Sequence, residues 1–407
     1  MDSISNKEKK IKKIVLNYLK EFKELLKKNI REYGMFIALF IIMITFSILT
    51  GGTFMSPRNL SNLINSTGYI AVLTIGMTLI LIIRHIDLSV GYVAGFLGAI
   101  VAILMTSMKF NPAVSILIIL LIGIVIGLFY GFLIGKVGIP AFVVSLAGML
   151  VFRGLLMLAT QKTGTIIIPN DSFNDIGNGF IPDPVKLING YHSLTLLLGM
   201  VGIALYIITE LRNRRNMQKY EFEVLSKSMF VSKLIFVSIL IGYIIWMLSR
   251  YNGLSWTVVI VLIVTAAYHF LTTKTVLGRQ IYAIGGNPEA AKLSGINVTK
   301  VTYFVFASMS MLAALAGVLY TSRLQSATTT AGLGFELDAI AAAYVGGVST
   351  SGGVGKVTGS LIGALVMSSL TSGMNLMGVD ISYQYIIRGI ILVVAVVFDI
   401  ITRSKKG

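Results

Sequence analysis

The chain carries the sequence GRQIYAIGGNPEAAKLSGINV at residues 278–298, a polar segment rich in small residues that separates two long apolar runs. Asn287 and Pro288 are residue types that begin helices, and Gly295 is a residue type that ends them. The pattern predicts a short helix between Glu289 and Gly295. Because the flanking sequence is apolar, this water-facing helix is expected to be a docking element.

The composition indicates a membrane protein with many spans. Hydrophobic residues make up 55% of the 407 residues and charged residues only 13%, against roughly 25% charged in a typical soluble domain. The chain has no cysteine, which excludes a disulfide framework, a thiolate metal site and a cysteine nucleophile, and it has only three histidines. We therefore expect neither a metal nor another cofactor.

The formal net charge of +17 raises the question of nucleic-acid binding, but the distribution of basic residues favours membrane orientation. Lys and Arg gather beside apolar runs, at 1–31, 212–233, 274–300 and the C-terminus, as the positive-inside rule requires. We predict that both termini and the 274–300 loop are cytoplasmic, and that the charged surface faces a lipid membrane and no nucleic acid.

Hydropathy predicts an all-α polytopic fold with about twelve crossings. A basic segment at 1–33 has helical apolar spacing and is expected to lie on the inner leaflet as an amphipathic helix, followed by a transmembrane domain over 34–407. Eleven long runs would leave the termini on opposite sides, so a short twelfth crossing, a half-helix or broken helix covered by protein, is predicted at 337–348. The eleven runs are 35–49, 67–83, 88–107, 114–134, 142–160, 194–209, 230–248, 256–271, 301–321, 358–377 and 383–400.

Glycines recur every fourth residue in two regions. The first set is Gly123, Gly127, Gly131 and Gly135, and the second is Gly355, Gly359 and Gly363. Such ridges let helix backbones approach closely in a membrane. Packing within one subunit is the favoured interpretation, while the run beginning at Thr358 is also a candidate to meet a second copy of the chain.

The segment GGVGKVT at 352–358 is similar to a phosphate-binding loop but departs from its pattern. That loop needs Gly at position 350 and Ser or Thr at position 357, where the chain has Thr350 and Val357. We interpret the segment as a cytoplasmic turn that enters the next span, so that any nucleotide would be bound by a partner.

Charged residues near the spans are candidate functional residues. Arg84, Asp87, Glu336 and Asp338 lie at predicted helix ends, where a carboxylate stabilises a helix N-terminus; a proton relay or an acid and base pair is the alternative. Arg153 lies in the middle of an apolar run. Because arginine is costly in lipid, it is expected to face the protein interior or a water-filled cavity, and it is the leading candidate for a pathway residue.

Four blocks of sequence resemble the inner-membrane permeases of the ribose, galactose and xylose ABC transporters. They are IDLSVG at 86–91, IPAFVVSLAGMLVFR at 139–153, the 278–298 segment, and ELDAIAAAYVGGVSTSGGVGKVTGSLIG at 336–363. The 278–298 segment is also similar to the EAA loop of such permeases, which rests on the ATP-hydrolysing subunit. An extra pair of runs at 194–248 makes the chain similar in length to the xylose-type permease.

The resemblance implies an ABC-importer permease fold and three partners, which are a second permease copy, ATP-binding ABC subunits and an extracytoplasmic sugar-binding protein that contacts the 161–192 loop. The 274–300 loop would be the cytoplasmic coupling loop. Its implied coupling residues are Gly285, Gly286, Asn287, Glu289, Ala290, Ala291 and Gly295. The expected cargo is a monosaccharide, a pentose such as D-xylose.

A neutral sugar needs hydroxyls, amides and aromatic faces along its pathway. The polar candidates on the spans are Asn65, Ser66, Thr67, Ser368, Ser369, Ser372, Asn375 and Gln384. Hydroxyls in helices also bond to the backbone or to neighbouring helices, so a structural role is the alternative for each.

Three other functions stay open from the sequence. The cargo could be ribose, galactose or a sugar-like signalling molecule. An ion-coupled secondary transporter would also explain a broken helix, and it would need an intramembrane acid such as Asp87 or Asp338. A membrane enzyme is the third, although no set of catalytic residues is assembled in the sequence.

Overall fold

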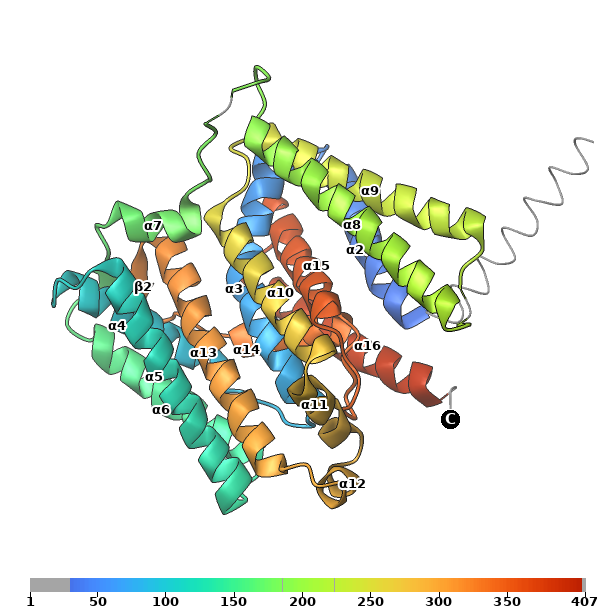
Figure 1. Ribbon diagram of the computed structural model, residues 1–407. Coiled ribbons are helices and arrows are strands. Elements are labelled where there is room, and N and C mark those ends of the chain that lie inside the picture. The colour runs from blue at the N-terminus through green and yellow to red at the C-terminus, as the bar shows by residue number, and fades with distance from the viewer. Residues whose placement is uncertain (1–29, 185, 223, 405–407) are drawn as a thin grey trace, which may run out of the picture. The chain divides into compact units, whose positions relative to one another are not determined.

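The computed structural model describes residues 30–184, 186–222 and 224–404 (Figure 1). Residues 1–29 of the predicted amphipathic segment lie outside the described residues. The helices and strands are α2 (Ile30–Leu49), η1 (Thr53–Met55), α3 (Pro57–Ile82), α4 (Val90–Thr106), α5 (Pro112–Phe132), η2 (Leu133–Val137), α6 (Ala141–Thr160), β1 (Thr165–Ile167), α7 (Asp171–Asn178), α8 (Ser193–Lys219), α9 (Lys227–Ser249), α10 (Trp256–Lys274), α11 (Val276–Gly286), α12 (Pro288–Leu293), α13 (Val298–Leu324), β2 (Ser326–Thr328), α14 (Phe335–Val345), α15 (Val357–Leu376) and α16 (Ile381–Ser404).

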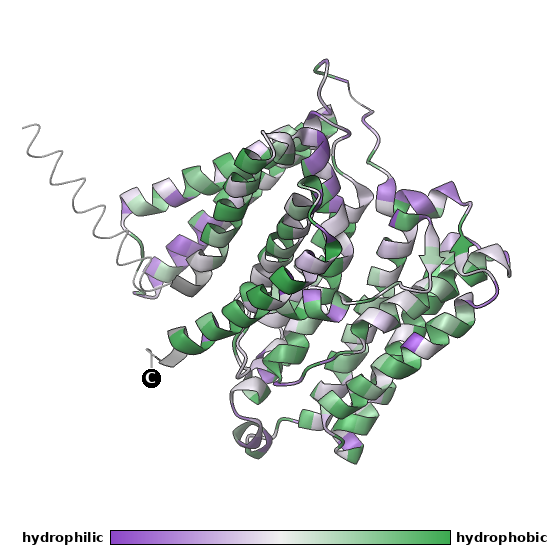
Figure 2. Ribbon diagram, turned by 180° about the vertical axis from the view of Figure 1, so that it is seen from behind, coloured by the Kyte–Doolittle hydropathy of each residue, from purple (hydrophilic) through white to green (hydrophobic). Residues whose placement is uncertain are grey.

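Nine helices in the described part of the chain are long and apolar enough to cross a membrane, and 34–49 and 90–106 are shorter apolar helices. Figure 2 shows hydrophobic residues along the helices and hydrophilic residues mainly at helix ends and in connections. The short helix predicted at 337–348 is α14, which has 11 residues. It ends at Val345 because Gly346 and Gly347 follow, and Gly347 has a φ of 87° that favours glycine. The all-α polytopic prediction is confirmed.

The chain divides into two compact units. The described part of the larger comprises residues 35–55, 59–180 and 255–404, and that of the smaller comprises 30–34, 56–58, 181–184, 186–222 and 224–254. The core of the larger unit contains α3, α4 and α13, whose side chains Leu73, Leu97 and Phe306 are fully buried. A helix that is apolar on all sides is expected where no side of it meets water, either in a protein core or across a membrane.

The first glycine ridge lies against α13 in the same chain. A Cβ at Gly127 would overlap the backbone carbonyl of Phe306, and one at Gly131 would lie 2.7 Å from the Cα of Tyr303. Packing within one subunit is therefore confirmed for this ridge. The α5 and α13 backbones approach closely because glycine leaves no side chain between them.

We expect Gly127→Ala to destabilise the protein by about 1–3 kcal/mol, because an added methyl group against a backbone carbonyl forces two packed helices apart. Thermal unfolding in detergent measures this change. Gly154→Ala is the matched control, since Gly154 is also helical but a Cβ there has no neighbour within 4 Å, and alanine favours helix over glycine by up to about 1 kcal/mol. Equal stability of the two variants would show that α5 and α13 can move apart at Gly127 without a loss of stability.

The helices α14 and α15 pack against each other as a hairpin, and α14 also packs on α16. A Cβ at Gly363 would overlap the carbonyl of Ala342, and one at Gly346 would lie 2.5 Å from the carbonyl oxygen of Gly359. The glycines of α15 thus face α14 within the chain. Gly355 does not belong to this ridge, because α15 begins only at Val357.

Strands β1 and β2 form a two-stranded antiparallel sheet that pairs Ile166 with Ala327. This sheet holds the connection after α6 against the end of α13. The hydroxyl of Ser322, near the end of α13, donates to the carbonyl of Phe173 on α7 at 2.8 Å. The extended connection at 161–180 is therefore an ordered part of the larger unit.

The smaller unit contains α8 and α9, which coincide with the runs predicted as an inserted pair at 194–248. The two helices are joined by a short connection and linked by an ion pair between Lys233 and Glu210, with an N to O distance of 3.0 Å. The chain enters and leaves the segment 181–254 at adjacent points, because Ile181 N donates to Leu254 O at 2.9 Å and Phe180 pairs with Ser255 in an antiparallel bridge.

Candidate functional site

A cavity of about 490 Å³ lies between the ends of five helices of the larger unit. It is lined by Asn59, Asn62, Leu63, Ser66, Tyr69 and Ile70 of α3, Arg323 of α13, Leu333 before α14, Phe335 and Asp338 of α14, Met367, Ser368, Thr371, Ser372, Asn375 and Leu376 of α15, and Arg388 of α16. Its volume is in the range of small-molecule sites, about 300–1,000 Å³.

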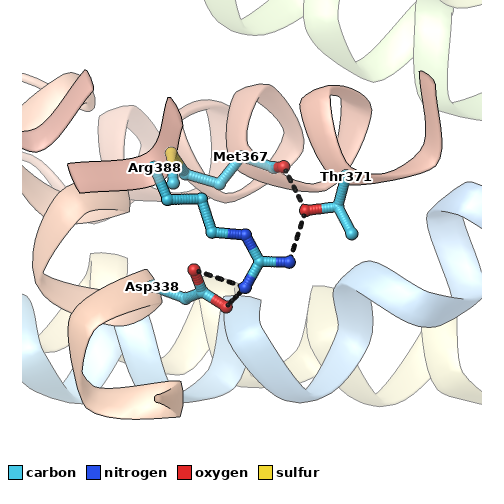
Figure 3. Close-up of polar contacts among 4 residues, drawn as sticks. All are labelled: Asp338, Met367, Thr371 and Arg388. Carbon is cyan, nitrogen blue, oxygen red and sulfur yellow. Dashed lines mark hydrogen bonds and ion pairs between the residues drawn. The ribbon is translucent and has the colours of Figure 1, made fainter. Parts of the chain in front are cut away.

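An ion pair crosses this cavity from α16 to α14 (Figure 3). Arg388 Nη1 lies 3.1 Å from Asp338 Oδ2 and 3.3 Å from Oδ1, and Arg388 Nη2 donates to the hydroxyl of Thr371 on α15 at 3.1 Å. The side chains are only 24% and 17% exposed. Because the two opposite charges neutralise each other, the cavity presents hydrogen-bonding groups without a net charge from this pair.

Aromatic rings form another part of the cavity wall. The rings of Tyr69 and Phe335, both in the lining, have centroids 4.7 Å apart. Tyr320 of α13 lies behind them, with centroids 5.1 Å from Tyr69 and 4.9 Å from Phe335. Tilted and edge-on pairs at such distances stabilise each other, so the wall holds its aromatic faces in fixed positions.

Amides and hydroxyls supply the remaining polar lining. Asn375 Oδ1 accepts a hydrogen bond from Gln384 Nε2 at 2.8 Å, and Gln384 Nε2 also donates to the carbonyl of Val379 at 3.0 Å. Gln384 therefore orients the amide of Asn375 from behind, although it does not line the cavity itself. The Ser372 hydroxyl lies 3.5 Å from Asn59 Oδ1, which links α15 to α3.

The cavity brings together part of the predicted pathway set. Ser66, Ser368, Ser372 and Asn375 line it, as does the helix-end acid Asp338. Three others lie elsewhere in the described chain. Asn65 is buried and accepts from the hydroxyl of Ser255, Thr67 donates to the carbonyl of Leu63 at 2.7 Å, and Ser369 is buried. A direct contact of any of these side chains with substrate stays a prediction.

Arg153 does not lie in the protein interior of this chain. The buried face of α6 contains Val144, Gly148, Phe152 and Leu156, spaced as one stripe of a helix. Arg153 is about 100° around the helix from Phe152 and is exposed, with its guanidinium 5.9 Å from the centroid of Tyr92. The expected interior position does not hold for the single chain, because the position of a residue along a run does not tell which face of the helix it is on. The alternative, that Arg153 faces a water-filled cavity, and its role as a pathway residue stay predictions.

Sequence reasoning missed Arg388, although a signal was present. It is the one charged residue between Ile381 and Phe398, an apolar stretch in which an ionisable residue indicates function. Its partner Asp338 precedes it by 50 residues, so only the fold could show that the two meet.

The segment 278–298 contains the predicted short helix, which is α12, while its docking role stays a prediction. Asn287 Oδ1 accepts hydrogen bonds from the amides of Glu289 and Ala290, each at 3.0 Å, and Pro288 is the first residue of α12. Gly295 has a φ of 82° and ends the turn. Leu293 at the C-terminal end of α12 is 90% exposed.

The predicted coupling residues divide between two faces of this segment. Gly286, Asn287, Glu289, Ala290 and Gly295 are exposed, whereas Gly285 and Ala291 are buried against the rest of the chain. The exposed set and Leu293 together form a surface that we call the α12 face. It is followed directly by α13, whose 27 residues extend about 40 Å before Arg323 reaches the cavity.

The helix-end charges have different partners. Arg84 does not pair with Asp87, but donates from Nε to the carbonyl of Gly285 at 2.7 Å. Asp87 Oδ1 accepts from the amide of Ser89 at 2.9 Å and from its hydroxyl at 2.6 Å, just before α4. Burial lowers the pKa of the neighbouring His85, so the positive charge of this connection belongs to Arg84.

Glu336 lies in the first turn of α14 and is buried beside Gly91. Its carboxylate is therefore at a helix N-terminus, as predicted. Among residues 30–184, 186–222 and 224–404, no group of three or more His, Cys, Asp or Glu side chains could hold a metal ion.

The sequence of the chain matches a family of permeases. The family is described as "Branched-chain amino acid transport system / permease component", and its model matches residues 59–187 and 178–396. The chain belongs to this permease family. The matched residues include the cavity lining, the α12 face and the α14 and α15 hairpin.

The permease is similar to sugar permeases over nearly its whole length. It is 39% identical over 379 residues to the xylose transport system permease protein XylH of Haemophilus influenzae, which covers 93% of this chain and 98% of that protein. It is 36% identical to XylH of Escherichia coli K12, covering 93% and 94%, and 34% identical to the ribose import permease protein RbsC of Haemophilus influenzae, covering 92% and 95%. No solved structure matches the permease. It is a sugar ABC permease of the xylose and ribose type, as the resemblance implied.

Proposed function

We propose that this permease forms the translocation pathway of an ATP-driven importer for a pentose such as D-xylose, and that the cavity is its sugar-binding part. The observation that carries the proposal is the lining of that cavity, where a neutralised ion pair, several amides and hydroxyls, and a fixed aromatic wall converge. A neutral polyol is recognised by hydrogen bonds to its hydroxyls and by apolar faces against its C–H groups.

The preference for xylose rests on sequence similarity. Identity is 39% and 36% to the two xylose permeases and 34% to the ribose permease, which supports the pentose class more strongly than one member of it. Ribose, galactose and a sugar-like signalling molecule are the alternative cargoes. A panel of sugars, each presented with a cognate binding protein, separates them.

The α12 face supports a partner that hydrolyses ATP on a separate chain. A capped helix that exposes Leu293 to the extent of 90% suits a groove on such a subunit, and both termini would then face the cytoplasm with it. An extracytoplasmic sugar-binding protein would contact the opposite side, where 161–180 packs on the end of α13. We further propose a homodimer of permeases as the transporting unit.

The test is uptake by vesicles that contain the permease and its ATP-binding partner, with binding protein supplied outside. We expect uptake of radiolabelled xylose that stops when ATP is removed and continues when an ionophore removes the proton and sodium gradients. Uptake that follows the ion gradient and ignores ATP would replace this function with that of an ion-coupled transporter.

The aromatic wall gives a further prediction. Tyr69→Ala is expected to lower the rate of xylose uptake by about three- to tenfold, because it removes the ring from the lining together with its contacts to Tyr320 and Phe335, and an aromatic pair contributes about 0.5–1.5 kcal/mol beyond its buried area. Tyr69→Phe keeps the ring and is the matched control. The initial rate of uptake at saturating binding protein measures both. If Tyr69→Phe lost as much uptake as Tyr69→Ala, the hydroxyl and not the ring would be the recognition element.

A further inference from the structure

We propose that residues 349–356, here called the glycine turn, are the link through which the 278–298 segment moves the α14 and α15 hairpin that lines the cavity. The inference rests on the proposed function, since it assumes that an ATP-binding partner acts on the α12 face. It assigns a role to Arg84, Gly285 and Gly353, none of which touches the cavity.

Arg84 holds the end of the coupling segment's first helix. Its Nε donates to the carbonyl of Gly285 at 2.7 Å, and its Nη2 donates to the carbonyl of Gly286. These carbonyls end α11 just before α12. Arg84 itself has a φ of 64°, a conformation that is uncommon for a residue with a side chain and that clusters at functional sites.

The glycine turn touches the same place through its backbone. Gly353 N donates to the carbonyl of Ile82, at the end of α3, at 2.9 Å. A Cβ at Gly285 would overlap that carbonyl and would lie 2.5 Å from Gly353 N. The hydroxyl of Tyr282 on α11 donates to the carbonyl of Gly355 at 2.6 Å. The end of α3, the end of α11 and the glycine turn therefore meet backbone to backbone at Gly285 and Gly353, with no flexible side chain between them.

The other side of the turn is fixed to the helices that line the cavity. The turn closes on itself through Ser349 N, which donates to Val354 O at 2.9 Å. Asp399 of α16 accepts hydrogen bonds from the amide and the hydroxyl of Thr350, both at 3.0 Å. The same helix carries Arg388 of the cavity ion pair, so the turn and that ion pair are joined by α16.

The helix α15 connects the glycine turn to the cavity, so a displacement of the turn would move the cavity lining. Its 20 residues extend about 30 Å. Val357 follows the turn directly, and at the other end of α15 the cavity is lined by Met367, Ser368, Thr371, Ser372, Asn375 and Leu376. Close packing of α15 on α14 through glycine makes the pair a rigid element, which is the kind of element that shifts as a body between two arrangements.

The test uses the absence of cysteine in the chain. Ser368→Cys places one thiol in the cavity lining, and the rate of its alkylation by N-ethylmaleimide reports the accessibility of the cavity in vesicles that contain the permease and its ATP-binding partner. We expect ATP to change this rate by about fivefold or more, the lower end of common allosteric couplings. The change is expected to be lost when Arg84→Ala or Gly285→Ala is added, while the ATP-binding partner still co-purifies.

Two controls separate this role from a general loss of folding. Arg84→Lys keeps a cationic donor and is expected to recover part of the response. Gly389→Ala adds a methyl group to a helical glycine that has no neighbour within 4 Å and is expected to leave the response unchanged. An undiminished ATP-dependent change in the alkylation rate in both Arg84→Ala and Gly285→Ala would overturn the role of the glycine turn but not the proposed function. No response in the Ser368→Cys parent would overturn the proposed ATP-driven cavity, and the link with it.

Discussion

Replacing Arg388 with alanine is expected to lower sugar uptake by on the order of 10- to 100-fold, which corresponds to about 1.4–2.8 kcal/mol. The change removes guanidinium donors from the cavity and leaves the carboxylate of Asp338, only 17% exposed, without its partner at 3.1 Å. Truncating one member of a desolvated charge pair costs about 2–5 kcal/mol, and water in the cavity reduces that figure. The initial rate of uptake in vesicles with both partner proteins measures the effect.

A double variant separates sugar binding from structural support. Arg388→Gln with Asp338→Asn removes both charges together, so no unpaired charge is left in the cavity. The double variant is expected to regain the thermal stability that Arg388→Ala loses, and to stay defective in uptake. Uptake at the parent rate in this variant would show that the ion pair only holds α16 against α14.

Leu293→Asp is expected to weaken binding of the ATP-binding partner by on the order of 10- to 100-fold and to stop transport at ordinary partner concentrations. Burying a leucine side chain contributes about 1.5–3 kcal/mol, and a carboxylate at the same place adds a desolvation cost. Because Leu293 is 90% exposed in the chain alone, the substitution leaves the permease folded. Co-purification in detergent and ATP-dependent uptake are the two measurements.

Conservative and disruptive variants of the α12 face check this assignment. Leu293→Met keeps an apolar side chain of similar size and is expected to bind the partner normally. Gly295→Pro removes an amide that donates to Lys292 O at 3.0 Å and cannot adopt the φ of 82°, so it is expected to abolish transport, as is Glu289→Lys. Normal co-purification and transport of Leu293→Asp and Glu289→Lys would assign the partner surface elsewhere.

Local features were predictable from the sequence because their causes are local. Asn287, Pro288 and Gly295 supply a cap, a first-turn residue and a helix end within nine positions. The helix α12 runs from Pro288 to Leu293, with Asn287 as its cap and Gly295 two residues beyond its end. The spacing of Gly123 and Gly127 likewise predicted a close helix contact. The charge balance of the termini required one more crossing, and α14 supplies a helix too short to span a bilayer alone.

The cavity was only half predictable because its residues come from segments that are distant in sequence. Ser368 and Asn375 were identified by residue type on an apolar span, whereas Tyr69, Phe335 and Arg388 enter the site through the packing of α3, α14 and α16. Hydropathy gives the position of a residue along a run but not its direction around the helix. This is why Arg153 was singled out while Arg388 was missed, and why the carbonyl partners of Arg84 were not predicted.

The segment 181–254, which contains α8 and α9, begins and ends at adjacent points, so it can be deleted or replaced as one block. Since Phe180 and Ser255 already lie side by side, a short turn between them would close the remaining polypeptide without moving either end. The deletion removes two candidate spans, α8 and α9, and because this number is even, every later segment stays on the same side of the membrane. Deletions and insertions are tolerated best where the two chain ends at the site are adjacent. The Phe180–Ser255 bridge is therefore a suitable place for the loss or gain of a segment in evolution and for the insertion of a reporter domain.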